Sequence, residues 1–164
     1  MGHSELLMTI GAIVAFAIAS FSINQNSMRN SEAIYATQAE FYATMLAQRF
    51  IEETKTEAFD QNTITATADD VTDFSATLAL GGSESYLGPT FFNDVDDYNG
   101  LTRTENTAVG PMQISISVIY VDESNLNADA GSQRYFKKMT VTVQSAYLNS
   151  PVRAHYVFSF QRNP

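Results

Sequence analysis

The chain has 164 residues, enough for one modest globular domain behind an N-terminal apolar run, and 45% of its residues are hydrophobic, which excludes disorder of the whole chain. It contains no cysteine, so disulfide frameworks and thiolate metal sites are excluded. The net charge of −9 is uneven: residues 52–129 hold fifteen acids against Lys55 and Arg103, whereas residues 130–164 hold five bases and no acid. No basic patch with interleaved aromatic residues is present, and no nucleic-acid partner is expected.

The N-terminal run from Leu6 to Ile23 contains no charged residue, and Glu5 stands directly before it. At about 1.5 Å per residue this run makes a helix of about 27 Å, close to the bilayer hydrocarbon thickness of about 30 Å. We therefore expect a membrane-spanning helix. Neither Lys nor Arg precedes it, unlike in a secretory signal peptide or an ordinary signal anchor.

The position of Glu5, the length of the apolar run and the missing basic flank together resemble the mature start of a type IV pilin or pseudopilin. In that family a short basic leader is removed, the new terminal amine is methylated, and an acid occupies the fifth position of a hydrophobic helix. The resemblance implies an N-methylated amine at Met1 that neutralises Glu5 of a neighbouring subunit. The alternative is that Glu5 only interacts with the positive end of its own helix.

The same resemblance implies that the apolar side chains of the first helix form the core of a filament. The expected core residues are Leu6, Leu7, Ile10, Ile13, Val14, Phe16, Ile18 and Phe21.

After Ile23 the helix is expected to be interrupted around residues 20–31, because the Asn and Ser residues of 24–31 compete with backbone hydrogen bonds. Residues 31–59 recover a helical spacing of apolar side chains and predict an amphipathic helix. Its expected apolar stripe consists of Ile34, Tyr35, Phe41, Tyr42, Met45, Leu46, Phe50 and Ile51. We thus divide the chain into a hydrophobic helix at 1–30 and a globular head at 31–164.

Three later segments alternate between apolar and polar residues and predict antiparallel strands at 112–122, 136–148 and 152–162. Residues 122–134 read as an exposed loop, and residues 60–110 as a variable loop region with one or two short strands near 63–80. The predicted fold class is α+β, in which a long N-terminal helix packs on an antiparallel sheet, as in the pilin fold.

The densest group of candidate ligands lies in "FFNDVDDYNG" at 91–100. Asp94, Asp96, Asp97 and Asn99 offer hard oxygen atoms of the kind that Ca²⁺ prefers, although the spacing is not that of an EF-hand. An acidic turn capped by its own side chains is the alternative. The string also resembles a short motif of pilin-like proteins from mannose-sensitive haemagglutinin pilus systems.

No nucleophile elbow, phosphate loop or zinc spacing appears in the sequence, and we expect no enzymatic activity and no cofactor other than this calcium ion. His3 lies at the N-terminus. His155 is expected on the exposed face of the last strand.

The resemblance implies a structural subunit of a type IV pilus-like filament on the bacterial cell surface. Its partners would be further copies of itself in a helical homopolymer, the inner membrane before assembly, a prepilin peptidase and methylase, and the pilus assembly machinery. One alternative is a minor pilin or type II secretion pseudopilin. Another is a membrane-tethered, calcium-dependent adhesion domain that acts as a monomer.

Overall fold

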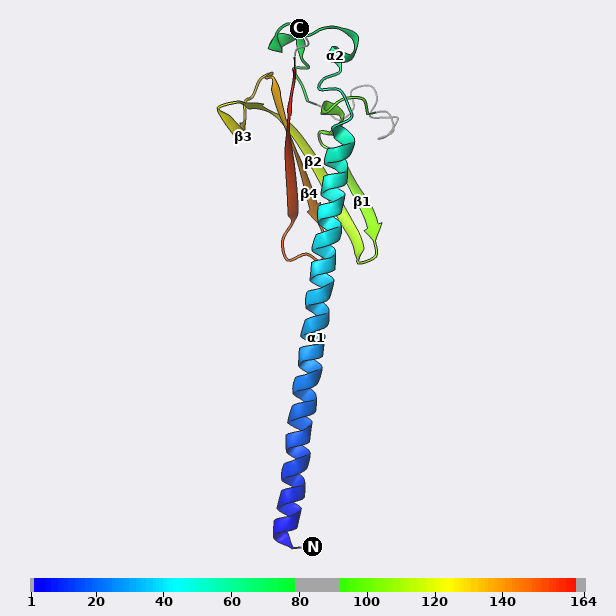
Figure 1. Ribbon diagram of the computed structural model, residues 1–164, viewed down its shortest axis with the longest axis vertical. Helices are drawn as coiled ribbons and strands as arrows, with labels where there is room; N and C mark the ends of the chain where they lie inside the picture. Colours follow the sequence, from blue (N-terminus) through cyan, green and yellow to red (C-terminus); the bar gives the residue numbers. More distant parts are fainter. Residues whose placement is uncertain (1, 79–91, 162–164) are drawn as a thin grey trace. The chain divides into compact units, whose positions relative to one another are not determined.

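The computed structural model describes residues 2–78 and 92–161, and the structural statements below concern that part of the chain. It contains a long helix α1 (His3–Thr54), a short helix α2 (Asn62–Thr65) and a five-stranded antiparallel sheet (Figure 1). The predicted α+β class is confirmed. The chain divides into two compact units, residues 1–38 and 39–164, which are described one at a time. Met1, residues 79–91 of the predicted loop region and residue 162 of the last predicted strand lie outside the described residues.

The first unit is a single stretch of helix that continues without a break through residues 24–31. The expected interruption is therefore wrong. Once a helix exists on both sides, each further residue adds a hydrogen bond without a new nucleation cost, so a weak segment is carried along. The hydroxyl of Ser31 donates a hydrogen bond to the carbonyl of Ser27, one helical turn earlier. The polar side chain is thereby satisfied without breaking the helix.

In the second unit α1 ends at Thr54 rather than at residue 59, and its buried face differs from the expected stripe. Of the expected stripe, Phe41 and Met45 are exposed here, as are Ile34 and Tyr35 in the first unit. Small alanines take their place, because a side chain with a single methyl group lets the helix backbone come close to the sheet. The buried residues of α1 are Ala39, Ala43, Leu46, Ala47, Phe50, Ile51 and Thr54.

The sheet has the strand order β1-β2-β4-β5, with β3 pairing to β2 outside this path. The strands are β1 (Thr102–Thr107), β2 (Gly110–Asp122), β3 (Asn125–Asp129), β4 (Phe136–Gln144) and β5 (Val152–Ser159). Strands β2, β4 and β5 correspond to the three predicted strands, although β4 ends at Gln144 instead of at residue 148. Strands β1 and β3 were not predicted, and β3 lies in the stretch expected to be a loop.

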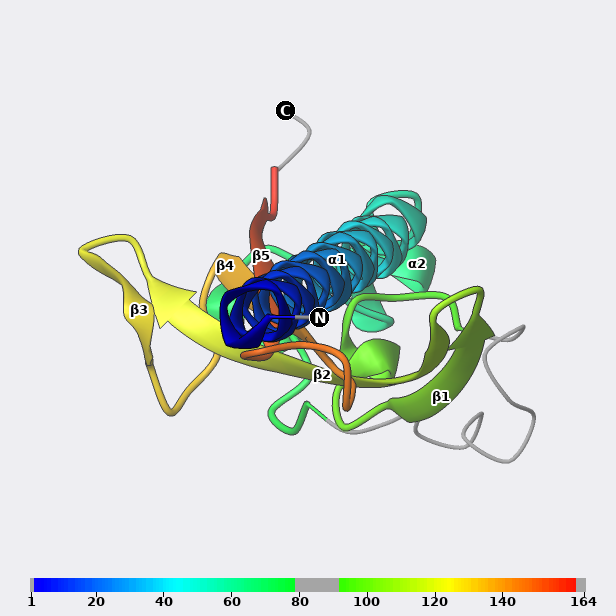
Figure 2. The same cartoon turned by 90° about the horizontal axis from the view of Figure 1, so that it is seen from below.

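Strand β2 is bonded along both of its edges. On one edge it pairs with β4, and on the other with β1 near its beginning and β3 at its end (Figure 2). On that second edge, between the part of β2 that pairs with β1 and the part that pairs with β3, two more hydrogen bonds form. The Gly100 amide donates to the Ile116 carbonyl at 3.0 Å, and the Ile116 amide donates to the Leu101 carbonyl at 2.9 Å. The segment just before β1 is thereby fixed to the middle of β2.

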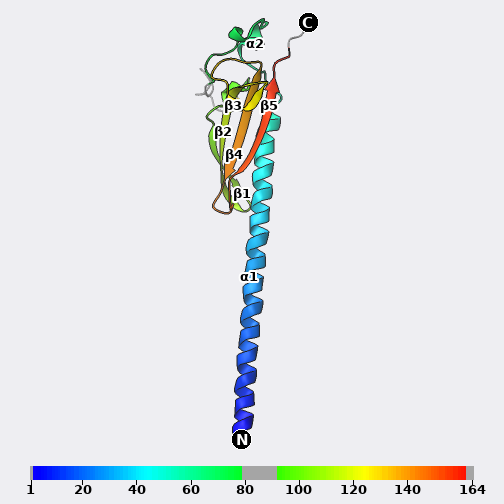
Figure 3. The same ribbon diagram turned by 90° about the vertical axis from the view of Figure 1, so that its left-hand side faces the viewer.

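One face of the sheet carries the main core, against the C-terminal part of α1 (Figure 3). The alternating residues of β2 and β4 point toward the helix, as the sequence pattern predicted. The sheet side of this core includes Met112, Ile114, Ile116, Val118, Met139, Val141 and Val143.

A second, smaller core is built around Phe74 and Tyr120, with Phe59 and Phe160 packed against them. The rings of Phe59 and Phe160 lie 5.2 and 5.1 Å from that of Phe74. The stretch 63–78, where short strands were expected, contains α2 and a 3₁₀ turn at Val71–Asp73 instead. The side chains of Asp70 and Asp73 each accept a hydrogen bond from backbone amides at the other end of this turn. This capping box favours a helical turn over a strand.

Candidate functional sites

The apolar side chains of the first unit have no cover. Each of the eight expected filament-core residues from Leu6 to Phe21 is between 50% and 75% exposed. By length and composition α1 is apolar enough to cross a membrane. In water such a surface is unfavourable at roughly 25 cal/mol per Å² of apolar area.

Glu5 lies at the exposed beginning of α1. Its carboxylate Oε2 accepts a hydrogen bond from the backbone amide of Gly2 at 3.1 Å. An acid in the first turn of a helix often accepts such a bond from the amide of the residue that precedes the helix. The contact is the one expected if Glu5 interacts with the positive end of its own helix. The terminal amine of Met1 lies outside the described residues, so its pairing with Glu5 stays a prediction.

The acidic segment around residues 93–99 is placed by backbone pairing with the chain just after α1. The Ala58 amide donates to the Asn93 carbonyl at 3.1 Å, and the Val95 amide donates to the Ala58 carbonyl at 3.0 Å. This short parallel bridge brings Asp60 beside the acids of the segment.

Two of the four predicted calcium ligands hold the turn together. Asp94 Oδ1 accepts from the amides of Asp96 and Asp97 at 2.9 and 3.1 Å, and Asp97 Oδ2 accepts from the amides of Asn93 and Asp94 at 2.9 and 3.3 Å. These are the self-capping contacts of the alternative that the sequence left open.

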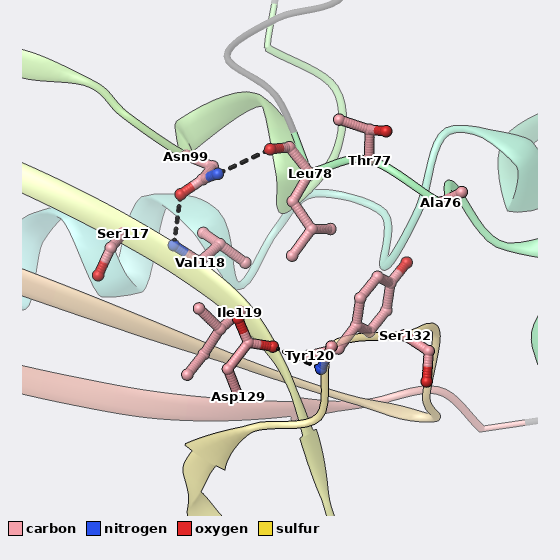
Figure 4. A pocket seen from close by; sticks show the side chains of 11 residues that line it. Ala76, Thr77, Leu78, Asn99, Ser117, Val118, Ile119, Tyr120, Asp129 and Ser132 are labelled. Carbon is pink, nitrogen blue, oxygen red and sulfur yellow. Dashed lines mark hydrogen bonds between the residues drawn. The ribbon is translucent and has the colours of Figure 1, made fainter.

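Asn99 joins two other parts of the chain. Its side-chain amide donates to the Leu78 carbonyl at 2.8 Å, and its side-chain oxygen accepts from the Val118 amide, also at 2.8 Å (Figure 4). Both ends of the side chain are thus engaged with backbone groups. A pocket of about 380 Å³ lies beside it, and the ionisable residues in its lining are Tyr120 and Asp129.

At the centre of the acidic group lies a cation, the ammonium of Lys137 on β4. Its Nζ donates to the Phe59 carbonyl at 2.7 Å and to Asp60 Oδ2 at 2.8 Å, and it lies 2.5 Å from Asp96 Oδ1. The side chains of Lys137 and Asp60 are fully buried, and that of Asp96 is 8% exposed. Neither Lys137 nor Asp60 was predicted from the sequence as part of a site.

The two acids beside Lys137 are held very differently. Asp60 also accepts from the Ser75 amide at 3.0 Å, the Ser75 hydroxyl at 3.0 Å, the Asn62 amide at 3.1 Å and the Tyr120 hydroxyl at 3.2 Å. Asp96 contacts the Lys137 ammonium as an ion pair. Neither oxygen of Asp96 accepts a hydrogen bond from the described residues.

These surroundings shift the pKa values of the acids in this group in different directions. Burial alone would raise the pKa of Asp60, but the Lys137 charge and the hydrogen bonds to Asp60 outweigh it and lower that pKa below its ordinary range. Burial raises the pKa of Asp96 to about 8, against the opposing pull of Lys137. Burial and the neighbouring charge of Asp97 raise the pKa of Asp94 to about 6. Burial thus favours the neutral form of Asp96, whereas Lys137 and the hydrogen bonds favour the ionised form of Asp60.

The carboxylates that converge are Asp60, Asp94 and Asp96, whose oxygens lie within 4.8 Å of one another. Asp97 and Asn99 are not part of this set, because their side chains form hydrogen bonds with backbone groups. A calcium ion would have to displace the Lys137 ammonium from the centre of the group. Calcium binding by the four predicted residues stays a prediction, and the positive charge already present argues for a structural cluster.

His155 lies on the exposed side of β5, opposite Thr140 of β4, and His3 lies at the exposed beginning of α1.

The chain was compared with protein-family models, with curated proteins and with solved structures, and no match was found in any of the three comparisons.

Proposed function

We propose that this protein is the structural subunit of a type IV pilus-like filament, held in the inner membrane by its first helix before assembly. The observation that carries the proposal is the uncovered apolar surface of α1 from Leu6 to Phe21, on a helix that reaches into an α+β head. No enzymatic site is part of this proposal.

Lipid and neighbouring helices are both suitable cover for this surface. Transfer from lipid to protein gains little hydrophobic free energy, because lipid tails are already apolar. Close packing and a specific polar contact must then favour assembly. Glu5 is the single acid at the end of the apolar segment, and within the described residues its carboxylate accepts a hydrogen bond from the Gly2 amide. A positive group on a neighbouring copy would pair with it and set the stagger between subunits.

The exposed apolar residues of α1 within the second unit support the same proposal. Phe41 and Met45 are 63% and 49% exposed, on the part of the helix whose other face is buried against the sheet. In a helical polymer these side chains would contact further copies. A monomer would leave them in water.

The test is the variant Glu5→Gln, which removes the charge and keeps the size of the side chain. We expect it to accumulate as a membrane-bound monomer with a folded head and to form no filaments in electron micrographs. Glu32→Gln is the matched control, because Glu32 is another exposed acid of the same helix, and it should assemble normally. Normal filaments from Glu5→Gln would contradict the proposal.

Purified filaments also separate the remaining alternatives. A dominant band of this chain supports the major-subunit role, whereas a trace amount among other subunits supports a minor pilin or pseudopilin. A membrane-tethered adhesion domain predicts that wild type forms no filaments and that Ca²⁺ raises the melting temperature of the head.

A further inference from the structure

We propose that Lys137 and Asp96 react with each other to form an intramolecular amide bond, which links β4 covalently to the turn before β1. The juxtaposition that suggests it is a fully buried lysine amine 2.5 Å from a carboxyl oxygen that accepts no hydrogen bond, with a second carboxylate, Asp60, 2.8 Å from the same nitrogen. These are a nucleophile, an acyl group and a proton carrier.

Asp96, rather than Asp60, is the acyl partner. Amide formation removes one oxygen atom from the carboxyl group. In Asp60 each oxygen accepts a hydrogen bond from Ser75, and one also accepts a hydrogen bond from the Tyr120 hydroxyl. The loss of either oxygen would therefore break existing hydrogen bonds. In Asp96 the loss of one oxygen breaks no hydrogen bond within the described residues.

The surroundings favour condensation over hydrolysis. The Lys137 nitrogen lies 4.5 and 5.1 Å from the ring centres of Phe59 and Tyr120, and its side chain has no exposed surface. Such a dry site holds the reacting groups at a high effective concentration and keeps water, the product of the reaction, away from the amide. The reaction also removes a buried ion pair, whose desolvation is unfavourable.

The steps balance within the three side chains. The Lys137 ammonium gives a proton to the Asp60 carboxylate, and the free amine attacks Cγ of the protonated Asp96 to form the new C–N bond. Asp60 then passes a proton from the nitrogen to a hydroxyl of the tetrahedral carbon, the C–O bond breaks, and one water molecule leaves. Asp60 ends protonated and the amide is neutral, so no oxidant, metal or second substrate is needed.

The inference does not depend on the filament proposal, because all three residues lie in the second unit. The bond would join the turn at Asp96 to the strand at Lys137 across a long intervening stretch that includes β1, β2 and β3. Such a link restricts the unfolded chain strongly and resists mechanical extension.

The test is peptide mapping of the full-length protein, extracted from membranes in detergent and digested with trypsin. We expect one branched peptide in which residues 56–103 are joined to residues 135–138, lighter than the two parts by one water molecule and uncleaved after Lys137. Fragmentation should place the link at Asp96. Separate peptides at their sequence masses, or a link at Asp60, would overturn the proposal.

Variants provide readouts that a purely structural cluster would not give. Asp96→Asn should yield a branched peptide of the same mass as wild type, since loss of ammonia from the new side chain produces the identical amide. Asp96→Ala and Lys137→Arg should yield none, and Lys138→Arg, at the neighbouring lysine, should retain the link. Asp60→Asn keeps both reacting groups, and a wild-type yield of the branched peptide from it would overturn the role of Asp60 as proton carrier.

Discussion

Helix α1 has two parts with the same backbone conformation and opposite surfaces. In residues 3–38 the large apolar side chains are exposed and no residue is buried, whereas from Ala39 to Thr54 one narrow face is fully buried against a sheet. The difference is in how the apolar residues are arranged. Within the first part, residues 6–23 are apolar all around, as a helix in lipid or a helix bundle requires, whereas the second part buries one stripe of alanines and a few larger residues. Secondary structure alone therefore says little about the solvent of a helix.

The largest effect on the second part is expected from Phe50→Ala. Phe50 is 1% exposed in the main core, so its removal leaves a cavity that should lower the free energy of unfolding by about 3–5 kcal/mol. The measurement is urea unfolding in detergent, followed by near-ultraviolet circular dichroism. Membrane association should not change. Phe41→Ala, which truncates a 63% exposed ring of the same helix, is the control and should have little effect on the monomer.

The converse effect on the first part is expected from Val14→Asp. A charge near the middle of the apolar run should cost about 2.5–3.5 kcal/mol for insertion into a membrane. The fraction of protein recovered in carbonate-washed membranes should fall, while the head keeps its melting temperature. Ser27→Asp places the same charge beyond the run and should remain inserted. Equal loss of both variants from membranes would contradict the distinction between the two parts of α1.

A turn of the sheet gives a smaller, purely local effect. Gly110 begins β2 with φ of 119°, and a Cβ built on it would lie 2.5 Å from Cε2 of Tyr147. Gly110→Ala should therefore lower the free energy of unfolding by about 2 kcal/mol through backbone strain and this clash. Gly131→Ala also requires a positive φ, of 66°, but enters open space, and it should cost about 1 kcal/mol. Equal losses would show that Tyr147 moves away at no cost.

The smallest effect concerns the ion pair that joins α1 to β1. Arg49 makes two hydrogen bonds to Glu105 and, with Arg103, lowers the pKa of Glu105 below its usual range. Because Arg49 is about half exposed, Glu105→Gln should cost only about 0.5–1 kcal/mol at neutral pH.

The sign of the pH dependence follows from the lowered pKa of Glu105 in the folded state. The contribution of the pair is complete above the unfolded pKa of about 4.3 and is lost as the pH falls through the lower folded value. Unfolding of wild type and Glu105→Gln should thus differ at pH 7 and coincide near pH 2. A difference that persists in acid would show that Glu105 acts by packing and not by charge.

The parts of the fold that were predicted are those in which the apolar pattern and the burial coincide. Strand β4, and β2 from Met112 to Tyr120, alternate between buried and more exposed residues because one face of each is covered. Strand β3 is exposed at all five residues, and β1 is half-buried at two of its six, so neither shows an alternation that distinguishes it from a loop. Their pairing with β2 depends on distant parts of the chain, which no local pattern reports.

The candidate site shows the same limit. The sequence marked the acids of residues 94–97 because they are adjacent in the chain, but Asp60 and Lys137 join them only through the fold. One local signal for Lys137 was available. It shares the parity of Met139, Val141 and Val143, which face the core, so a charged residue at that position must have a buried partner. No pattern in the sequence identified which acid this partner would be.

The two bonded edges of β2 also have a kinetic consequence. A strand that is paired on both sides cannot expose its amides by fraying at an edge, so its middle should open only when the whole head unfolds. Strands β1, β3 and β5 each pair with a single strand in the described part of the sheet and can detach first. Loss of structure in the head would then begin at these edge strands and reach the middle of β2 last, a sequence of events set by connectivity rather than by the strength of any one contact.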